Sequence, residues 1–394
     1  MPVKPRNPRT VAVHAGRDPR AQFGMINPPV WHASTVLFPT LEALDQAIRE
    51  PFEGLVYGLL GTPTSNALEQ AVAAMEHADR CIAVGSGLAA IAVAILPFVR
   101  SGDHLLISDG AYGPTRHLCE DWFSRWGIET SYYDPTIGAG IADLIRPNTR
   151  LIHLESPSSL TFEVPDVRAI VETAKARGLK TVIDNTWASP IFFQPMDLGV
   201  DAVILAGTKY IAGHSDLVIG FVATTEESWL PIKQAAADFG HHATPDDCYL
   251  ALRGLRTAAI RLKQHETSAL EVARWLQTRP EVRRVLHPAL PDHPGHAYWK
   301  RDFSGSSGLF AIELRPCSRA AIAAMVEGMS LFGIGFSWGG FESLILPFEP
   351  NALQRVSTLA HGGPLIRLHI GLEAVVDLIA DLERGFERLH RVTD

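Results

Sequence analysis

Short apolar runs alternate with helical patterns along the middle of the chain, starting near residue 64. Cys81-Ile-Ala-Val and Thr181-Val-Ile have the length of buried strands, and residues 166–177 carry apolar side chains at the spacing of an amphipathic helix that Gly178 ends. Alternating strands and helices are typical of a mostly parallel sheet that helices cover on both faces. Further strands are predicted at His104-Leu-Leu-Ile, Leu151-Ile-His-Leu, Ala202-Val-Ile-Leu and Leu217–Val222.

The two ends of the chain have a different texture. Residues 1 to about 55 are rich in proline and look irregular, and a long irregular arm usually packs on something, here a neighbouring subunit. After about residue 250, long helical patterns alternate with short strand candidates, which predicts a smaller α+β domain. The helices are expected at Leu255–Leu276, Arg319–Met329 and Glu373–Leu389, and the strands at Leu309–Leu314 and Leu365–Ile370.

Length and charge narrow the class of protein. A chain of 394 residues is too long for one ordinary core, so we expect an N-terminal arm over residues 1–60, a cofactor-binding domain over 61–250 and a C-terminal α+β domain over 251–394. The formal net charge of −8 disfavours nucleic acid or an anionic membrane as the main partner. Residues 1–10 lack the apolar core of a signal peptide and no segment has the ~20 apolar residues of a membrane span, so a cytoplasmic protein is expected.

A glycine-rich turn, Gly85-Ser-Gly-Leu-Ala-Ala, lies between a predicted strand and a predicted helix. Glycines there let the backbone approach an anion, and the N-terminus of the helix offers unpaired N–H groups. By itself the turn also fits the dinucleotide pattern G-x-G-x-x-A, with Asp109 ending the next strand at a plausible spacing. On this motif alone an NAD-dependent dehydrogenase remains an alternative, as does a tight turn with no ligand.

A carboxylate and an amine follow two other predicted strands. Asp184 ends the strand at 180–183, and Lys209 follows the strand at 202–206, directly after Thr208. Parallel strands deliver such residues to the same carboxyl edge, where open α/β sheets bind ligands. Pyridoxal 5′-phosphate needs a lysine that forms a Schiff base, a carboxylate that keeps the pyridine nitrogen protonated, and a cradle for the phosphate. The combination therefore predicts an enzyme that uses pyridoxal phosphate.

These segments, with others along the chain, resemble the Cys/Met-metabolism family of pyridoxal-phosphate enzymes. The likeness covers nearly the whole chain, and several motifs in the expected order are far more specific than any one of them. The resemblance implies the aspartate-aminotransferase-like fold (fold type I), with a mainly parallel seven-stranded cofactor domain, and a homotetramer built as a dimer of dimers with shared active sites. The motifs are Tyr57-Gly-Leu-Leu-Gly-Thr-Pro-Thr, Asp109-Gly-Ala-Tyr-Gly-Pro-Thr, Glu155-Ser-Pro-Ser-Ser, Asp184-Asn-Thr, Gly207-Thr-Lys-Tyr-Ile-Ala-Gly-His-Ser-Asp, Leu252-Arg-Gly-Leu-Arg-Thr, Ser337-Trp-Gly-Gly-Phe-Glu-Ser and Leu365-Ile-Arg-Leu-His-Ile-Gly.

The resemblance also implies a role for each residue of the predicted site. Lys209 binds the cofactor and carries protons, and Asp184 pairs with the pyridine nitrogen. Tyr112 stacks on the ring and takes part in catalysis and substrate binding. Arg367 grips the carboxylate of a small amino-acid substrate, a task that suits a planar bidentate donor. The phosphate would be held by Ser86, Gly87, Leu88 and Thr208, while Tyr57 would reach the phosphate in the neighbouring subunit.

Two features resemble the bacterial cystathionine β-lyases of this family. Ser337-Trp-Gly-Gly stands where many γ-enzymes have Ser-Leu-Gly-Gly preceded by an acidic residue, and Ser159 stands where many members carry asparagine. We expect Ser337 and Trp338 to line the substrate pocket. The resemblance implies β-elimination of L,L-cystathionine to homocysteine, pyruvate and ammonia, a step in methionine biosynthesis. A cystathionine γ-lyase, a γ-synthase, a methionine γ-lyase and a cofactor-binding regulator without turnover remain alternatives.

The predicted contact between subunits departs from the family pattern. The family commonly has Tyr-x-Arg there, whereas this chain has Tyr57-Gly58-Leu59 and lacks the arginine. Either another basic residue replaces it or the phosphate is bound more weakly. The histidines form no metal-ligand pattern, and no metal is expected.

Overall fold

The computed structural model describes residues 7–348, 356–357 and 361–393, and its larger layer is a seven-stranded sheet with the strand order β1-β7-β6-β5-β4-β2-β3. β7 runs antiparallel to both of its neighbours, and the other neighbouring pairs are parallel. The predicted mostly parallel sheet is thereby confirmed. The strands are β1 (Arg80–Val84), β2 (His104–Ser108), β3 (Glu129–Tyr133), β4 (Thr149–Glu155), β5 (Lys180–Asp184), β6 (Ala202–Leu205) and β7 (Gly220–Thr224).

Apolar side chains cover both faces of this sheet, which explains why its strands are nearly continuous apolar runs. On β2 every residue is buried, and Leu106 belongs to one hydrophobic cluster while Leu105 belongs to another. The same alternation on β6 places Val203 and Ile204 in different clusters. Successive side chains of a strand point to opposite faces, so the two clusters are the two sides of the sheet.

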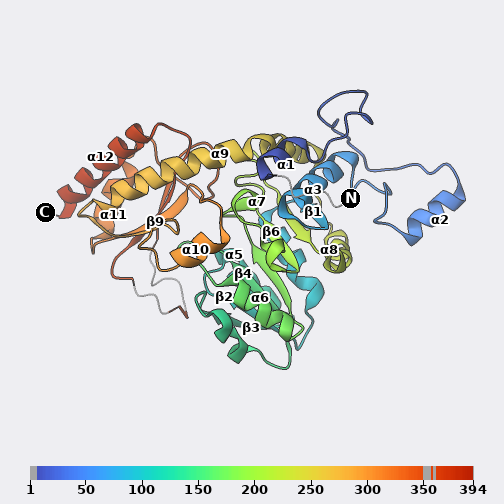
Figure 1. Ribbon diagram of the computed structural model, residues 1–394, viewed down its shortest axis with the longest axis horizontal. Coiled ribbons are helices and arrows are strands. Elements are labelled where there is room, and N and C mark those ends of the chain that lie inside the picture. Colours follow the sequence, from blue (N-terminus) through green and yellow to red (C-terminus); the bar gives the residue numbers. More distant parts are fainter. Residues whose placement is uncertain (1–6, 349–355, 358–360, 394) are drawn as a thin grey trace.

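Helices surround the large sheet (Figure 1) and contribute side chains to both clusters. Hydrogen-bonded caps fix where these helices begin. The Thr62 hydroxyl accepts the N–H of Ser65 at 3.2 Å, while the Ser65 hydroxyl accepts the N–H of Thr62 at 2.9 Å. This capping box, with Pro63 in the first helical position, sets the start of α3. The helices around the large sheet are α3 (Pro63–Glu76), α4 (Gly87–Ile95), α5 (Gly113–His117), α6 (Val167–Ala176), α7 (Ser189–Phe192) and α8 (Glu226–Asp238).

A second, five-stranded sheet has the strand order β10-β11-β12-β9-β8. The 33-residue helix α9 connects the two sheets, because Leu255 packs in the core of the first and Leu276 in the core of the second. Among the described residues, no helix is long and apolar enough to cross a membrane. The remaining elements are β8 (Val282–Leu286), β9 (Leu309–Leu314), β10 (Gly333–Ile334), β11 (Leu344–Phe348), β12 (Leu365–His369), α9 (Pro245–Gln277), α10 (His296–Asp302), α11 (Arg319–Glu327) and α12 (Val375–Thr393).

The prediction of an irregular N-terminal arm is partly wrong, because two short helices form there. In α1 (Pro8–His14) the proline occupies the first turn, where a missing N–H costs nothing, and in α2 (Leu41–Arg49) the Thr40 hydroxyl caps the helix at 3.1 Å. The segment with α2 extends away from the body of the molecule (Figure 1). The first six residues, on which part of the signal-peptide prediction falls, lie outside the described residues.

A buried acid–amide pair lies directly behind the end of β5. Glu76, the last residue of α3, accepts a hydrogen bond from Nδ2 of Asn185 at 2.9 Å, and the same nitrogen donates to the carbonyl of Phe193 at 2.9 Å. Burial raises the pKa of Glu76 to about 8, so the acid keeps its proton at neutral pH. Because Asn185 follows Asp184, this pair holds the backbone where the predicted site begins.

We expect the free energy of unfolding to fall less steeply with rising pH in Glu76→Gln than in the wild-type protein. The carboxyl holds its proton in the folded state up to about pH 8 but loses it in the unfolded state above about pH 4.5, so its contribution to the free energy of unfolding falls across this range. Glutamine cannot ionise and keeps a hydrogen-bonding side chain of the same shape. Denaturant unfolding at several pH values measures the slope.

Glu172→Gln provides the matched control, because Glu172 is an exposed residue of α6. It should leave the slope of stability against pH unchanged. An equal slope in Glu76→Gln and the wild-type protein would mean that Glu76 is not the titrating group.

Candidate active site

Lys209 follows β6 at the carboxyl edge of the large sheet. Its amine donates a hydrogen bond to Oγ of Ser337 at 2.6 Å and lies 5.4 Å from the centre of the Trp338 ring. Burial lowers the pKa of Lys209 to about 8, and the positive charge of Arg367 adds to this, while the carboxylate of Asp184 acts in the opposite direction. The lysine therefore gives up its proton more readily than an exposed lysine, as a general base must.

Two carboxylates end neighbouring strands at the same edge. Asp184 on β5 and Glu155 on β4 are partners in the register of the two strands. Oδ1 of Asp184 accepts the N–H of Thr186 at 2.8 Å, and no ion pair among the described residues includes Asp184. Burial raises the pKa of both carboxyls, and the charge of Asp184 raises the pKa of Glu155 further.

Tyr112 and Arg367 reach the same site from two other elements. Tyr112 precedes α5, its backbone N–H donates to Oε2 of Glu155 at 2.7 Å, and its side chain is half exposed. Arg367 lies on β12 of the second sheet, and its guanidinium donates to the carbonyl of Ser337 at 3.0 Å. Burial raises the pKa of Tyr112, and the charges of Asp184 and Glu155 raise it further, while the charge of Arg367 acts in the opposite direction.

The predicted phosphate cradle lies where β1 leads into α4. The Ser86 hydroxyl caps the helix by accepting a backbone N–H of the first turn at 3.0 Å. The N–H groups of Gly87 and Leu88 stand in that first turn, where a helix supplies no partner for them. A Cβ on Gly87 would lie 2.7 Å from Cβ of Ala206, so glycine permits the close approach of α4 to the segment that leads to Lys209. The Thr208 hydroxyl is bonded to the backbone just before β7.

The dinucleotide interpretation of the Gly85 turn is wrong for this fold. A dinucleotide site needs its first strand paired in parallel inside the sheet, whereas β1 is an edge strand whose neighbour β7 runs antiparallel. Asp109, the acidic residue that completes this pattern, forms an ion pair with Arg116.

Comparison with known proteins identifies the family. Residues 9–387 match the model of the Cys/Met metabolism PLP-dependent enzyme family. The chain belongs to this family. Cystathionine beta-lyase MetC of Escherichia coli is 43% identical, over 96% of this chain and 98% of the relative. A cystathionine beta-lyase of Bordetella avium is 43% identical, over 96% and 97%. A solved cystathionine gamma synthase of Xanthomonas oryzae pv. oryzae matches with a TM-score of 0.90 at 32% identity, over 98% of this chain and 100% of that one.

The fold of this family and its dependence on pyridoxal phosphate are thereby confirmed, and the described side chains fit the cofactor. Asp184 is a buried carboxylate without an ion pair among the described residues, so it can accept a protonated pyridine nitrogen. The first-turn N–H groups of Gly87 and Leu88 form the kind of helix terminus that binds phosphate. The amine of Lys209 lies at the same sheet edge, where covalent attachment requires it.

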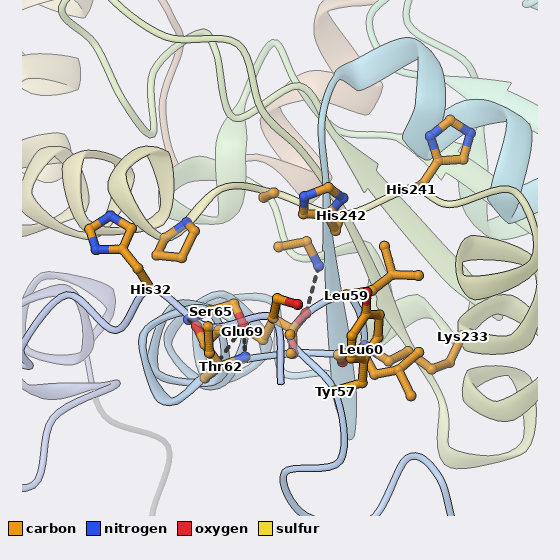
Figure 2. Close-up of a pocket in the computed structure, with 17 residues that line it drawn as sticks. His32, Tyr57, Leu59, Leu60, Thr62, Ser65, Glu69, Lys233, His241 and His242 are labelled. Atoms are coloured by element: carbon orange, nitrogen blue, oxygen red, sulfur yellow. Dashed lines mark hydrogen bonds between the residues drawn. The ribbon is translucent and has the colours of Figure 1, made fainter. Parts of the chain in front are cut away.

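Tyr57 does not join the Lys209 cluster within one chain. It lines a cavity of about 560 Å³ between the N-terminal arm and α3, together with Leu59 and Lys233 (Figure 2). Nζ of Lys233 donates to the carbonyl of Leu60 at 2.9 Å, and no other lysine or arginine is among the described residues that line this cavity. Contact of Tyr57 with the phosphate of a neighbouring subunit stays a prediction. Lys233 is the basic residue that shares the cavity with Leu59, the position where the family commonly has arginine.

Two residues that shape the site stand in the motifs quoted above but had no specific role assigned from the sequence. Glu155 holds the backbone of Tyr112, and its place at a strand end beside Asp184 was the available signal. His369 is buried, and its Nε2 lies 3.1 Å from the N–H nitrogen of Gly339. Its spacing of two residues from Arg367 puts both side chains on one face of β12.

We expect Lys209→Ala to abolish turnover in a protein that still folds and binds free cofactor. In its predicted role the amine is both the covalent anchor and the proton carrier, so no remaining group would replace it. Borohydride reduction of the wild-type holoenzyme, followed by peptide mass spectrometry, should find the pyridoxyl group on Lys209. Lys263→Ala removes a lysine on α9 and should leave turnover intact. A label on Lys180 or Lys233 would disprove the assignment.

Proposed function

We propose that the protein catalyses the β-elimination of L,L-cystathionine, which consumes water and releases homocysteine, pyruvate and ammonia. The observation that carries this proposal is the contact of Lys209 with the turn at residues 337–338, where its amine is bonded to Ser337 and lies near the Trp338 ring. Two relatives named cystathionine beta-lyase, each 43% identical over nearly the full chain, support it. The likeness to a cystathionine gamma synthase supports the fold without selecting the bond that breaks.

The choice of the β-carbon rests on the bases available near this turn. Elimination at the γ-carbon needs a second proton transfer, at the β-carbon. Residues 336–340 contain no carboxylate, and the nearest acid along the chain, Glu342, accepts hydrogen bonds from the Ser215 hydroxyl at 2.8 and 2.9 Å. Trp338 packs on Tyr210 with ring centres 5.5 Å apart and fills the space beside the lysine. These contacts leave no second base on this turn, and Lys209 suffices as the base for β-elimination.

Each side chain then has a defined task. When bound, pyridoxal phosphate supplies an aldehyde for the substrate amino group and a ring that accepts electrons from the α-carbon. The Lys209 amine, held by Oγ of Ser337, takes the α-proton and delivers a proton to the departing sulfur. Asp184 keeps the proton on the pyridine nitrogen, and Arg367 binds the α-carboxylate as a bidentate donor. Tyr112, whose side chain is half exposed, would stack on the ring.

We further propose that the active enzyme is a cytoplasmic homotetramer of methionine biosynthesis. The N-terminal arm carries large apolar side chains that the single chain leaves in solvent, since Phe23 is 96% exposed and Leu37 is 88% exposed. Exposed apolar groups on an extended arm favour burial against another subunit. The phosphate would then be held by Ser86, Gly87, Leu88 and Thr208 of one chain and by Tyr57 of its neighbour.

Cystathionine should be split into pyruvate, ammonia and homocysteine in equal amounts. The holoenzyme is incubated with L,L-cystathionine, and the keto acids and thiols are measured by mass spectrometry, with Lys209→Ala as the blank. Cysteine and 2-oxobutyrate as the main products would refute β-elimination, although the lysine assignment would survive. Binding of cofactor without any keto acid would point to a regulator without turnover.

Arg367→Ala should lower kcat/KM by about 10- to 100-fold, because a hydrogen bond to a charged group contributes roughly 1.5–3 kcal/mol. Arg367→Lys keeps the charge but loses the fork, so it should fall between the wild-type enzyme and the alanine variant. Arg315→Ala, which removes an exposed arginine bonded to the carbonyl of Pro280, should leave kcat/KM unchanged. Loss of cofactor with normal catalysis per bound cofactor would instead place Arg367 at the phosphate.

A further inference from the structure

Two side chains of β12, a strand of the second sheet, form hydrogen bonds with the backbone of the turn that carries Ser337. Arg367 of β12 donates to the carbonyl of Ser337 at 3.0 Å. His369 lies two residues along the same strand. Its Nε2 is 3.1 Å from the backbone nitrogen of Gly339 and 3.1 Å from the carbonyl oxygen of Gly340. Both side chains face the turn because alternate residues of a strand share a face.

This turn needs to be held, because its backbone is unfavourable by itself. Ser337 has a φ of 69° and Gly339 a φ of 87°, and a serine rarely adopts the left-handed region without support from its surroundings. The turn also lies directly on Lys209. A Cβ on Gly339 would come within 3.0 Å of three atoms of the lysine, two of them in its backbone. Any shift of the turn would therefore move the amine or break its hydrogen bond.

We propose that His369 is a positioning residue for Lys209, which acts by fixing the turn so that Oγ of Ser337 receives the lysine amine. The inference rests on the proposed role of Lys209 as the base. It concerns a residue that touches neither the lysine amine nor Ser337 in the described contacts, and acts through the backbone of Gly339 and the residue after it.

The surroundings of His369 keep the imidazole neutral. Burial lowers the pKa of His369 to about 3, and His265, Arg367 and Lys209 lower it further. A neutral ring carries one N–H, so Nε2 either accepts from the N–H of Gly339 or donates to the following carbonyl, and either bond holds the same turn. Positive charge would remove the acceptor and add repulsion toward the lysine.

Aromatic packing fixes the orientation of the ring. The centres of His369 and His265 are 5.3 Å apart, and Tyr210 lies 6.1 Å from His369 and 5.5 Å from Trp338. Nδ1 of His265 is bonded to the carbonyl of Ile370 at 2.8 Å, so the second ring is tied to the end of the same strand. The layer behind the site is therefore continuous from β12 to the tryptophan beside the amine.

The test compares His369→Gln with His369→Asn and His369→Leu. The glutamine amide can reach the backbone N–H and carbonyl that Nε2 serves, the asparagine amide is too short, and leucine keeps volume without polar atoms. We expect kcat to fall about 10- to 100-fold in the asparagine and leucine variants, the range that misplacement of a catalytic group produces, with little change in KM. The acid limb of kcat should shift to higher pH as water reaches Lys209, and glutamine should restore most of both.

A readout without substrate separates this inference from the proposed function. The visible absorbance of bound pyridoxal phosphate is titrated against pH in each holoenzyme, and the curve should move in the asparagine and leucine variants but hardly in His369→Gln. His287→Leu is the matched control, because His287 is also buried with a pKa lowered to about 3, beside Phe310. It should cost stability without moving the absorbance curve or the kcat profile.

Two outcomes would overturn the inference. The first is an asparagine variant with the wild-type kcat profile and absorbance curve. The second is a glutamine variant that folds but behaves no better than asparagine. Failure to release pyruvate from cystathionine, with the absorbance order intact, would reject the proposed reaction and leave the positioning role standing.

Discussion

The hydrogen bond between the Lys209 amine and Ser337 joins the segment after β6 of the large sheet to the turn between β10 and β11 of the second sheet. The site exists only while the two sheets keep their relative position. α9 sets that position, because one rigid helix contributes side chains to both cores. β12 then determines where the Ser337 turn lies. The placement of one nitrogen atom thus depends on packing that spans the molecule.

Burial disfavours the charged form of every ionisable group at the site. Burial lowers the pKa of Lys209 to about 8 and that of Arg367 to about 10, while it raises the pKa of Asp184 and Glu155. Each of these groups is therefore less stable in its charged form than it would be in water. A cofactor with a protonated ring nitrogen and a substrate with a carboxylate would give them partners. These buried groups lower the stability of the fold when no ligand is bound, and charged ligands would offset that loss.

The sequence predicted the parts of this protein that local pattern and motif control. Lys209 and Asp184 were found because residues at the ends of parallel strands share an edge, and the sheet was found because its strands are apolar on both faces. Glu155 and His369 stand in the quoted motifs, but their roles were not predicted because those roles are hydrogen bonds to backbone that is distant in sequence. α2 was missed because proline content outweighed a single capping threonine.

The predicted phosphate cradle offers few free side-chain donors within one chain. The Ser86 hydroxyl already caps α4, and the Thr208 hydroxyl is already bonded to backbone, so the cradle offers mainly N–H groups and the positive end of a helix. Those groups bind an anion but carry no full charge. The residue that the family pattern would supply from a neighbour is Leu59, which is apolar, and it shares its cavity with the ammonium of Lys233. A full positive charge opposite the phosphate would therefore have to come from a residue other than Leu59, such as Lys233 in the same cavity; without one, the phosphate is held by dipoles and N–H groups alone and is bound more weakly.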